Sequence, residues 1–247
     1  MLVAIGEATK LLSFLEKEDK VYEVSILLGA TSETYDSEGP IRVAKTVQKV
    51  SKTEIGKALK KYFSGERLQK PPIYSAVQIG GKRAYQLARS GQSVDLKSKK
   101  VFFHDIKIMD FKWPVLKCRV HCSSGTYIRS FAHDLGVILG AGAYCQDLRR
   151  ISIGRFTRSQ AISIDHVPKK IIEDSVTAPE KFLKDWSRID LQEREYRVLA
   201  HGGVILHRMH RKPVPMLALY EKQCVGILER TPDGTKLKFL KKFNTVE

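Results

Sequence analysis

The sequence predicts an α+β protein that ends in a small β module. Strand-like alternating segments and segments of helical spacing occur in the first three quarters of the chain, and short apolar runs follow one another near the C-terminus. The chain has 247 residues, and 43% of them are hydrophobic. This length and this apolar share are enough for a sizeable core in one large domain with a small appendage.

The first part of the chain predicts a strand followed by a helix. Residues 21–29 alternate and then become fully apolar, which is typical of a strand that enters a core and stops at a glycine. A polar turn follows over residues 31–40. Residues 53–63 carry apolar side chains at helical spacing, and either Ser51 or Thr53 can cap this helix.

The middle of the chain predicts two antiparallel strands and a second helix. Residues 101–108 and 116–122 are strand-like and are separated by a short polar segment. Alternation places Cys118, Val120 and Cys122 on one face of the second strand. Residues 128–139 have one apolar stripe, and glycines follow it, so we expect a helix there.

The C-terminal part differs in composition. Residues 165–186 resemble helix and linker, and residues 188–243 contain several short apolar runs. Pro-Asp-Gly at 232–234 lies between two of these runs and predicts a hairpin. We therefore expect a domain over residues 1–187 and a small β domain over residues 188–247.

The composition favours a polyanionic partner and argues against several protein classes. Lys and Arg number 43 and Asp and Glu number 27, so the formal net charge is +16. Such a surplus favours RNA, although a generally basic protein would also show it. The longest apolar run is far shorter than the roughly 20 residues that span a bilayer, and the N-terminus does not have the pattern of a signal peptide. Four scattered cysteines predict reduced thiols in the cytoplasm, and no metal site is predicted because the cysteines lack a second ligand pair.

One motif places an arginine at the start of the second helix. In Gly125-Thr126-Tyr127-Ile128-Arg129, the glycine permits a tight turn and Thr126 is suited to capping. Arg129 then lies in the first helical turn and points back towards the sheet. Such an arginine is ordinarily a surface residue, but a fixed guanidinium can also pair with a carboxylate and keep it ionised.

Two further motifs combine basic residues with tyrosines or with small residues. Residues 70–91 predict an extended entry, a glycine turn and a short helix at 84–89, with charges and tyrosines suited to looped RNA. A surface hairpin is the alternative. Residues 140–156 predict close backbone packing, with Leu148 buried and a basic face beside it. The candidate RNA-binding residues of these two motifs are Tyr74, Lys82, Arg83, Tyr85, Arg89, Arg149 and Arg150.

From residue 1 to about residue 164, these motifs occur in an order that resembles the bacterial TruB-type pseudouridine synthases, which isomerise uridine 55 in the T-loop of tRNA. The resemblance is carried by Gly6-Glu7-Ala8-Thr9-Lys10, by 123–136 around Arg129, by 70–91 and by the Leu148-Arg149-Arg150 segment. It implies a pseudouridine-synthase fold with a mixed, mostly antiparallel sheet flanked by helices. It also implies a thumb-like RNA-binding insertion at about 71–100 and a PUA-like C-terminal module.

The resemblance assigns roles to individual residues. Tyr22 matches the tyrosine that stacks on the target base, although a strand tyrosine by itself is ordinarily a packing residue. Arg129 matches the arginine that pairs with the catalytic aspartate, and Leu148 matches the leucine that lines the uracil pocket, although it could equally be a core residue. Tyr127 is expected to pack beneath the site.

The family's catalytic aspartate lies in a Gly-Thr-Leu-Asp-Pro segment, and this chain is expected to begin just after that segment. The resemblance therefore leaves Arg129 without its principal counter-ion. A late start codon or gene fragment, a non-catalytic tRNA-binding or chaperone protein, and substitution by another acid all fit this situation. Asp36 is the candidate for substitution, but nothing in the sequence places it in the pocket. The resemblance implies tRNA as the partner, no metal or organic cofactor, no membrane, and a monomer.

Overall fold

The computed structural model describes residues 1–46, 48–90, 92, 95–163, 165, 168–177, 183, 185–206 and 214–243, without the side chain of Arg89. The chain forms two compact units. One contains Phe14–Ala161, and the other contains Met1–Ser13 together with Ile162–Glu247. The predicted domain boundary between residues 187 and 188 coincides with the start of a strand, and it remains a prediction.

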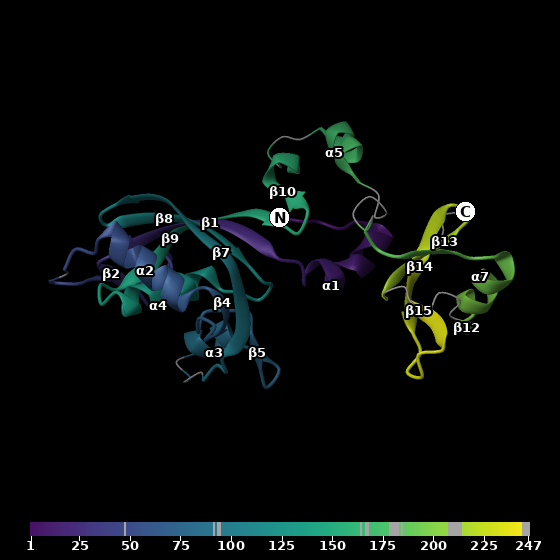
Figure 1. The fold of residues 1–247 in the computed structure, drawn as a ribbon, viewed down its shortest axis with the longest axis horizontal. Helices are drawn as coiled ribbons and strands as arrows, with labels where there is room; N and C mark the ends of the chain where they lie inside the picture. The colour runs from purple at the N-terminus through teal and green to yellow at the C-terminus, as the bar shows by residue number, and fades with distance from the viewer. Residues whose placement is uncertain are drawn as a thin grey trace. The chain divides into compact units, whose positions relative to one another are not determined.

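An antiparallel six-stranded sheet forms the centre of the first unit (Figure 1). Its spatial order is β10-β9-β1-β8-β7-β4. The strands are β1 (Lys20–Leu28), β4 (Gly65–Gln69), β7 (Lys99–Lys112), β8 (Val115–Cys122), β9 (Ala143–Ile153) and β10 (Phe156–Thr157). The predicted antiparallel pairing of residues 101–108 with residues 116–122 is confirmed, because β7 and β8 form that pair.

Two helices cover one face of this sheet. They are α2 (Lys52–Tyr62) and α4 (Ile128–Ile138), which lie side by side in Figure 1. Smaller elements complete the unit: β2 (Ala30–Ser32), β3 (Ile41–Val43), β5 (Gln78–Ile79), β6 (Lys82–Arg83), α3 (Ala84–Arg89) and the 3-10 turn η2 (Arg158–Gln160). The helices predicted at 53–63, 84–89 and 128–139 are confirmed within one residue at each end.

The core of the first unit lies between the sheet and these helices. Alternate residues of β1 and β8 point into it, and Cys118, Val120 and Cys122 are buried together as their alternation predicts. Phe63, Phe103 and Phe131 make edge-on or tilted ring contacts at 4.8 to 5.7 Å between centroids. The opposite face of the sheet carries polar side chains such as Glu23 and Arg119, which form an ion pair at 2.6 Å.

The position of α4 is fixed by a close approach of the backbone. A Cβ atom at Gly136 would lie 2.2 Å from the backbone nitrogen of Ala143, so only glycine allows α4 to pack this closely on the start of β9. Ser51 caps α2 through a capping box with Glu54, which decides between the two predicted capping residues.

The second unit contains a five-stranded sheet in the order β11-β13-β14-β15-β12. Its core includes Leu199, Met216 and Leu237, and β11 pairs with β13 in parallel whereas the other pairs are antiparallel. The hairpin predicted at Pro232-Asp233-Gly234 is confirmed between β14 and β15. The elements of this unit are η1 (Gly6–Leu11), α5 (Lys169–Ser175), β11 (Arg188–Asp190), α7 (Glu193–Ala200), β12 (Ile205–Leu206), β13 (Met216–Tyr220), β14 (Gln223–Arg230) and β15 (Lys236–Lys242). The short helix α1 (Leu12–Leu15) includes residues of both units.

Candidate active site

Arg129 is held in place by three oxygen atoms at the start of α4. Its Nη1 donates to Oδ2 of Asp36 at 2.7 Å and to the carbonyl of Thr34 at 3.4 Å, and its Nη2 donates to the carbonyl of Tyr74 at 3.0 Å. Asp36 is thus an acidic partner of Arg129 that is distinct from the family's catalytic aspartate, the principal counter-ion in the prediction. The polar turn after β1 folds back over the N-terminal end of α4 and brings Asp36, which is 93 residues away in sequence, to the guanidinium.

Asp36 is a well-satisfied carboxylate. Its side chain is 16% exposed, and Oδ1 accepts hydrogen bonds from the Thr34 hydroxyl and from the backbone of Glu38. Burial opposes ionisation, but the bonds from Thr34, Glu38 and Arg129 together outweigh it and lower the pKa of Asp36. The charge that holds Arg129 is consequently stable across the neutral range.

The turn that carries Asp36 is itself anchored. Tyr35 has a left-handed backbone (φ 63°), and its ring stacks on His133 of α4 with 3.9 Å between centroids. Its carbonyl accepts a hydrogen bond from the backbone of Cys145 on β9. Burial lowers the pKa of His133, which favours the neutral imidazole against the Tyr35 ring. The turn, α4 and β9 thus fix the Arg129–Asp36 pair from three sides.

A cavity of about 470 Å³ opens beside the guanidinium. This volume lies in the usual range for small-molecule sites. The cavity brings together the predicted residues Tyr74, Tyr85 and Arg129, although Tyr74 and Tyr85 belong to the 70–91 segment. Its other lining residues are Thr34, Glu38, Gly39, Pro40, Ser75 and Ala76.

Ser75 was not singled out from the sequence. Within the described residues, its buried hydroxyl has no hydrogen-bond partner, although Ser75 lines the cavity. A buried hydroxyl without a partner costs free energy, so it is a candidate for a hydrogen bond to a bound molecule. No signal in the sequence distinguishes this serine from its neighbours.

Tyr22 and Leu148 lie on neighbouring strands rather than in the cavity lining. Tyr22 on β1 pairs with Arg150 on β9, and Val24 pairs with Leu148, so these side chains share the helix-bearing face of the sheet. Burial raises the pKa of the Tyr22 hydroxyl, against the effect of a hydrogen bond and a nearby charge from Arg150.

The expected burial of Leu148 is wrong, because its side chain is 41% exposed. Helix α4 packs on the start of β9, where Ala143, Tyr144 and Cys145 are buried, but residues 146–150 extend beyond this cover. Leu148 is therefore an apolar side chain on an open part of the sheet. Arg149 and Arg150 are exposed beside it.

The N-terminus of α4 is not capped as predicted. Thr126 donates its hydroxyl to the carbonyl of Ser123, and the N-cap residue is Tyr127. The side chain of Gln69 from β4 instead bonds the backbone of the N-cap residue: its Oε1 accepts from the Tyr127 N–H at 2.8 Å, and its Nε2 donates to the Tyr127 carbonyl at 3.0 Å. Gln69 is 2% exposed and ties the Arg129 turn to the edge of the sheet.

The remaining predicted RNA-binding residues occupy the small β5–β6 hairpin and the helix after it. Lys82 and Arg83 are exposed on β6, and Gly80 and Gly81 form the hairpin turn with positive φ. Arg89 ends α3, and its side chain lies outside the described structure.

The comparisons with known proteins identify the family. Residues 1–128 match the N-terminal domain of the TruB family of pseudouridylate synthases, and residues 129–186 match the C-terminal domain of tRNA pseudouridylate synthase B. The chain belongs to the TruB family. Its members are pseudouridine synthases, which are isomerases.

Curated TruB relatives are similar over most of the chain. The tRNA pseudouridine synthase B of Clostridium acetobutylicum is 34% identical over 240 residues, covering 95% of this chain and 82% of the relative. That of Syntrophomonas wolfei is 40% identical over 235 residues, covering 92% and 78%.

Solved structures support the same fold at lower identity. A Cbf5-Nop10-Gar1 complex contains a chain with a TM-score of 0.68 and 19% identity, covering 98% of this chain and 71% of that one. An H/ACA ribonucleoprotein bound to a substrate RNA contains one with a TM-score of 0.66 and 17% identity, with the same coverages. The predicted pseudouridine-synthase fold is thereby confirmed. Among the described residues of this TruB chain, no helix has the length and apolarity to cross a membrane.

Proposed function

We propose that this protein is a tRNA pseudouridine synthase that isomerises uridine 55 in the T-loop. The observation that carries the proposal is the guanidinium of Arg129, fixed between Asp36 and the Tyr74 carbonyl at the wall of a cavity that also contains tyrosines. The curated relatives named tRNA pseudouridine synthase B support tRNA as the substrate. Residence in the cytoplasm and action as a monomer belong to the same proposal.

In this proposal, the target base leaves the stack of the T-arm and enters the site. Flipping a base costs a few kcal/mol, and stacking on an aromatic ring returns about 1–3 kcal/mol. Tyr22 provides that ring, and the exposed apolar side chain of Leu148 contacts the same uracil. Because Tyr22 and Leu148 share one face of the β1–β9 pair, a single base can touch both.

The reaction breaks the glycosidic bond to nitrogen and rejoins the uracil through carbon. The resemblance assigns assistance in this step to an aspartate of a Gly-Thr-Leu-Asp-Pro segment, and the 247 residues contain no such segment. Arg129 would hold that carboxylate ionised, since its guanidinium lines the cavity and can serve a second acid.

Asp36 is a poorer candidate for the nucleophile. Both of its oxygens already accept hydrogen bonds, one of them from Arg129. We therefore assign Asp36 to positioning Arg129.

The basic residues would hold the T-arm backbone. Lys82 and Arg83 on one hairpin and Arg149 and Arg150 on β9 are exposed and able to contact phosphates. Tyr74 and Tyr85 at the cavity suit contact with unstacked bases of the loop. Tyr127 supports the site through the backbone bonds that it makes with Gln69.

The test is tritium release from a T-arm RNA that carries 5-tritiated uridine at position 55. Three proteins are compared: the 247-residue chain, a version extended upstream through the family's Gly-Thr-Leu-Asp-Pro segment, and the same extension with asparagine for that aspartate. A T-arm with cytidine at position 55 and tritiated uridines elsewhere controls for position.

Release by the aspartate version alone, and only from position 55, is the expected result. If all three proteins bind the T-arm but none releases tritium, the protein is a non-catalytic tRNA-binding or chaperone protein and the proposal fails. Activity of the 247-residue chain would place the nucleophile among its own acidic residues and contradict the assignment of that role to the upstream aspartate.

A further inference from the structure

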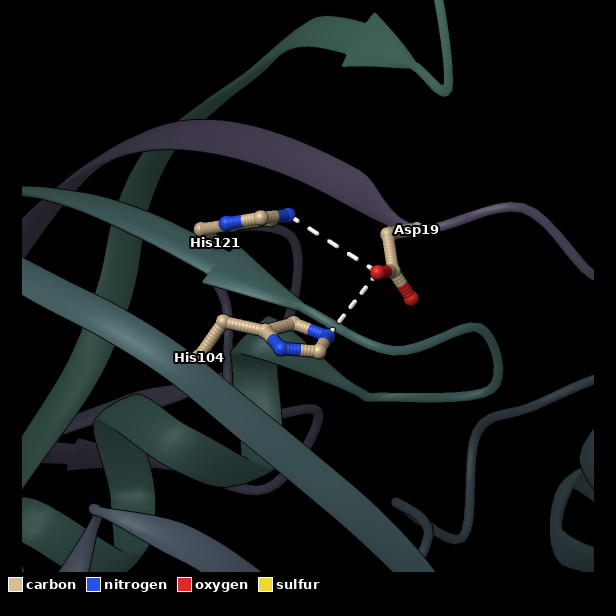
Figure 2. Close-up of side chains that lie close together, drawn as sticks. All are labelled: Asp19, His104 and His121. Carbon is tan, nitrogen blue, oxygen red and sulfur yellow. Dashed lines mark ion pairs between the residues drawn. The ribbon is translucent and has the colours of Figure 1, made fainter.

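Two histidines and one aspartate converge on the sheet face opposite the helices. Figure 2 shows the imidazoles of His104 and His121 directed at the carboxylate of Asp19. Nε2 of His104 lies 2.9 Å from Oδ2 of Asp19, and Nε2 of His121 lies 3.9 Å from the same oxygen. The three potential ligand atoms all lie within 4.8 Å of one another. We refer to these three residues as the Asp19 cluster.

The backbone around Asp19 is fixed. The Asp19 carbonyl accepts a hydrogen bond of 2.7 Å from the backbone of Gly154, in the turn between β9 and β10. The Lys20 ammonium donates to the carbonyls of Glu16 and Glu18 and so closes the turn that precedes β1. The carboxylate is thus presented from a structured turn.

A β-bulge directs His104 to the cluster. Phe103 pairs with Cys122, but the next pair is Asp105 with His121, so His104 is the additional residue on β7. A bulge of this kind sets two residues against one and re-aims a side chain, and bulges are enriched beside functional sites. The His104 ring packs between His121, at 4.5 Å between centroids, and Phe102, at 4.8 Å, which limits its rotamers.

We propose that the Asp19 cluster binds a divalent transition-metal ion of the Zn²⁺ class. Two imidazole nitrogens and one carboxylate oxygen are a donor set that suits Zn²⁺, Co²⁺ or Ni²⁺, whereas Mg²⁺ and Ca²⁺ prefer oxygen alone. Metal–ligand bonds of about 2.0–2.2 Å place neighbouring ligands about 3–3.5 Å apart. The observed separations therefore need only small side-chain rotations to reach a bound geometry.

Binding would use the imidazole lone pairs. Nε2 of His104 already lies 2.9 Å from Oδ2 of Asp19, and with metal both Nε2 atoms would offer lone pairs while the carboxylate supplies negative charge. The side chains of Asp19, His104 and His121 are 44%, 33% and 43% exposed, so water can complete the coordination. Such a site exchanges its ion with solvent.

The ion would act as a clamp on the sheet. Asp19 precedes β1, and the histidines belong to β7 and β8, so one ion would join all three segments. None of the three residues lines the cavity beside Arg129. The site is therefore independent of the proposed chemistry, and its failure would leave the proposed function untouched.

Isothermal titration calorimetry with Zn²⁺ tests the proposal. The 247-residue protein is stripped with chelator, kept reduced and titrated with ZnCl₂, and Co²⁺ absorption is recorded in parallel. The variants are His104→Gln, which removes one donor with a side chain of similar size, and Asp19→Asn. The matched control is the double variant His207→Ala and His210→Ala, which removes the two histidines that lie nearest each other in the sequence. Circular dichroism and urea midpoints in chelator show whether each variant is folded.

We expect one Zn²⁺ per chain, at least tenfold weaker binding in folded His104→Gln and Asp19→Asn, and unchanged binding in the control. The Co²⁺ spectrum should contain no thiolate charge-transfer band. Absence of stoichiometric binding would mean that the cluster is only an ion pair. Three results would place the ion elsewhere and overturn the proposal. They are a Zn²⁺ affinity in both ligand variants equal to that of the parent protein, loss of binding in the control, and a thiolate band in the Co²⁺ spectrum. If His104→Gln does not fold, Asp19→Asn, which keeps the size of the side chain, decides the question.

Discussion

Asp36 fixes the position of Arg129, and this role can be separated from chemistry. In a catalytically competent version of the protein, Asp36→Asn keeps the size of the side chain but removes the charge that faces Nη1 of Arg129. Misplacement of a reacting or positioning group by about 1 Å can cost about 100-fold in rate. We expect kcat to fall by about that factor while KM changes far less, as measured by single- and multiple-turnover tritium release.

The matched control is Glu33→Gln. Glu33 lies two residues before Tyr35 and pairs with exposed Arg42 rather than with Arg129. Its kcat should stay within about twofold of the parent. An equal loss in both variants would show that general disturbance of the turn, and not the charge of Asp36, is responsible.

The lowered pKa of Asp36 also predicts how stability depends on pH. Because its pKa lies below the ordinary value of 3.8, the ionised carboxylate stabilises the folded state above about pH 4, and this contribution is lost as the pH falls through the folded-state pKa. The stability difference between the parent and Asp36→Asn should be constant from pH 7 to about pH 5 and shrink below pH 4. Urea unfolding at each pH measures it. A difference that grows on acidification would contradict the assigned direction of the shift.

The exposure of Leu148 predicts that its truncation affects function more than folding. Leu148→Ala should cost under about 1 kcal/mol of unfolding free energy, because 41% of the side chain is already exposed. Leu116→Ala, at a fully buried position of β8, should cost about 2–5 kcal/mol. Urea denaturation compares the two, and tritium release in the competent version should show the larger loss for Leu148→Ala. Intact activity in that variant would remove Leu148 from the uracil pocket.

These residues show where sequence reasoning about the site ends. The motif around Arg129 predicted the helix and the arginine's position in its first turn, because glycine and helical spacing are local signals. Its pairing with Asp36 joins residues 93 positions apart, and no periodicity encodes that contact. Gln69 and the Asp19 cluster were missed for the same reason, because strand pairing and a bulge bring their partners together.

At the scale of the elements, the cap of α2 gives a direct test. The Ser51 hydroxyl accepts a hydrogen bond from the backbone N–H of Glu54, and the Glu54 carboxylate accepts one from the backbone N–H of Ser51. Ser51→Ala should therefore cost about 1 kcal/mol in urea unfolding. Thr53→Ala is the matched control, since Thr53 lies inside the same first turn and does not act as the cap. Equal costs in both variants would show that helix propensity and not the cap sets the effect.

The two helices also differ in what their glycines permit. Gly136→Ala places a Cβ 2.2 Å from the Ala143 backbone, so we expect a loss of at least about 1–3 kcal/mol from forced displacement of α4. Gly56→Ala in α2 meets no atom within 4 Å and should add about 0.5–1 kcal/mol through helix propensity. Thermal and urea unfolding of both variants test whether the two changes in unfolding free energy have opposite signs. A stabilising Gly136→Ala would disprove the close approach of α4 to β9.

Elements with strong periodicity were predictable, and their layering was less so. The helices at 53–63 and 128–139 and the β7–β8 pair follow from spacing and short connections. That α4 covers only the first residues of β9, and so leaves Leu148 open, depends on where a helix ends in space relative to a strand. Gln69 likewise bonds the backbone of the N-cap residue Tyr127 because β4 passes beside the start of α4.

At the scale of the whole molecule, the charge surplus predicts how RNA binding responds to salt. The formal net charge is +16, and each phosphate that a protein neutralises contributes about −0.7 to −0.9 to the slope of log K against log salt concentration. If the exposed basic residues of the hairpin and β9 contact the T-arm, at least four phosphates are involved, and the slope should be steeper than about −3. The slope is obtained from filter-binding or anisotropy measurements between 50 and 200 mM salt.

The double variant Lys82→Ala with Arg83→Ala should flatten this slope by about 1.4–1.8, because two phosphate contacts are lost. The double variant Lys169→Ala with Lys170→Ala removes an equally adjacent, exposed basic pair on α5 and should leave the slope unchanged. Equal flattening in both variants would mean that binding senses net charge alone, and a slope near zero in the parent protein would argue against RNA as the partner.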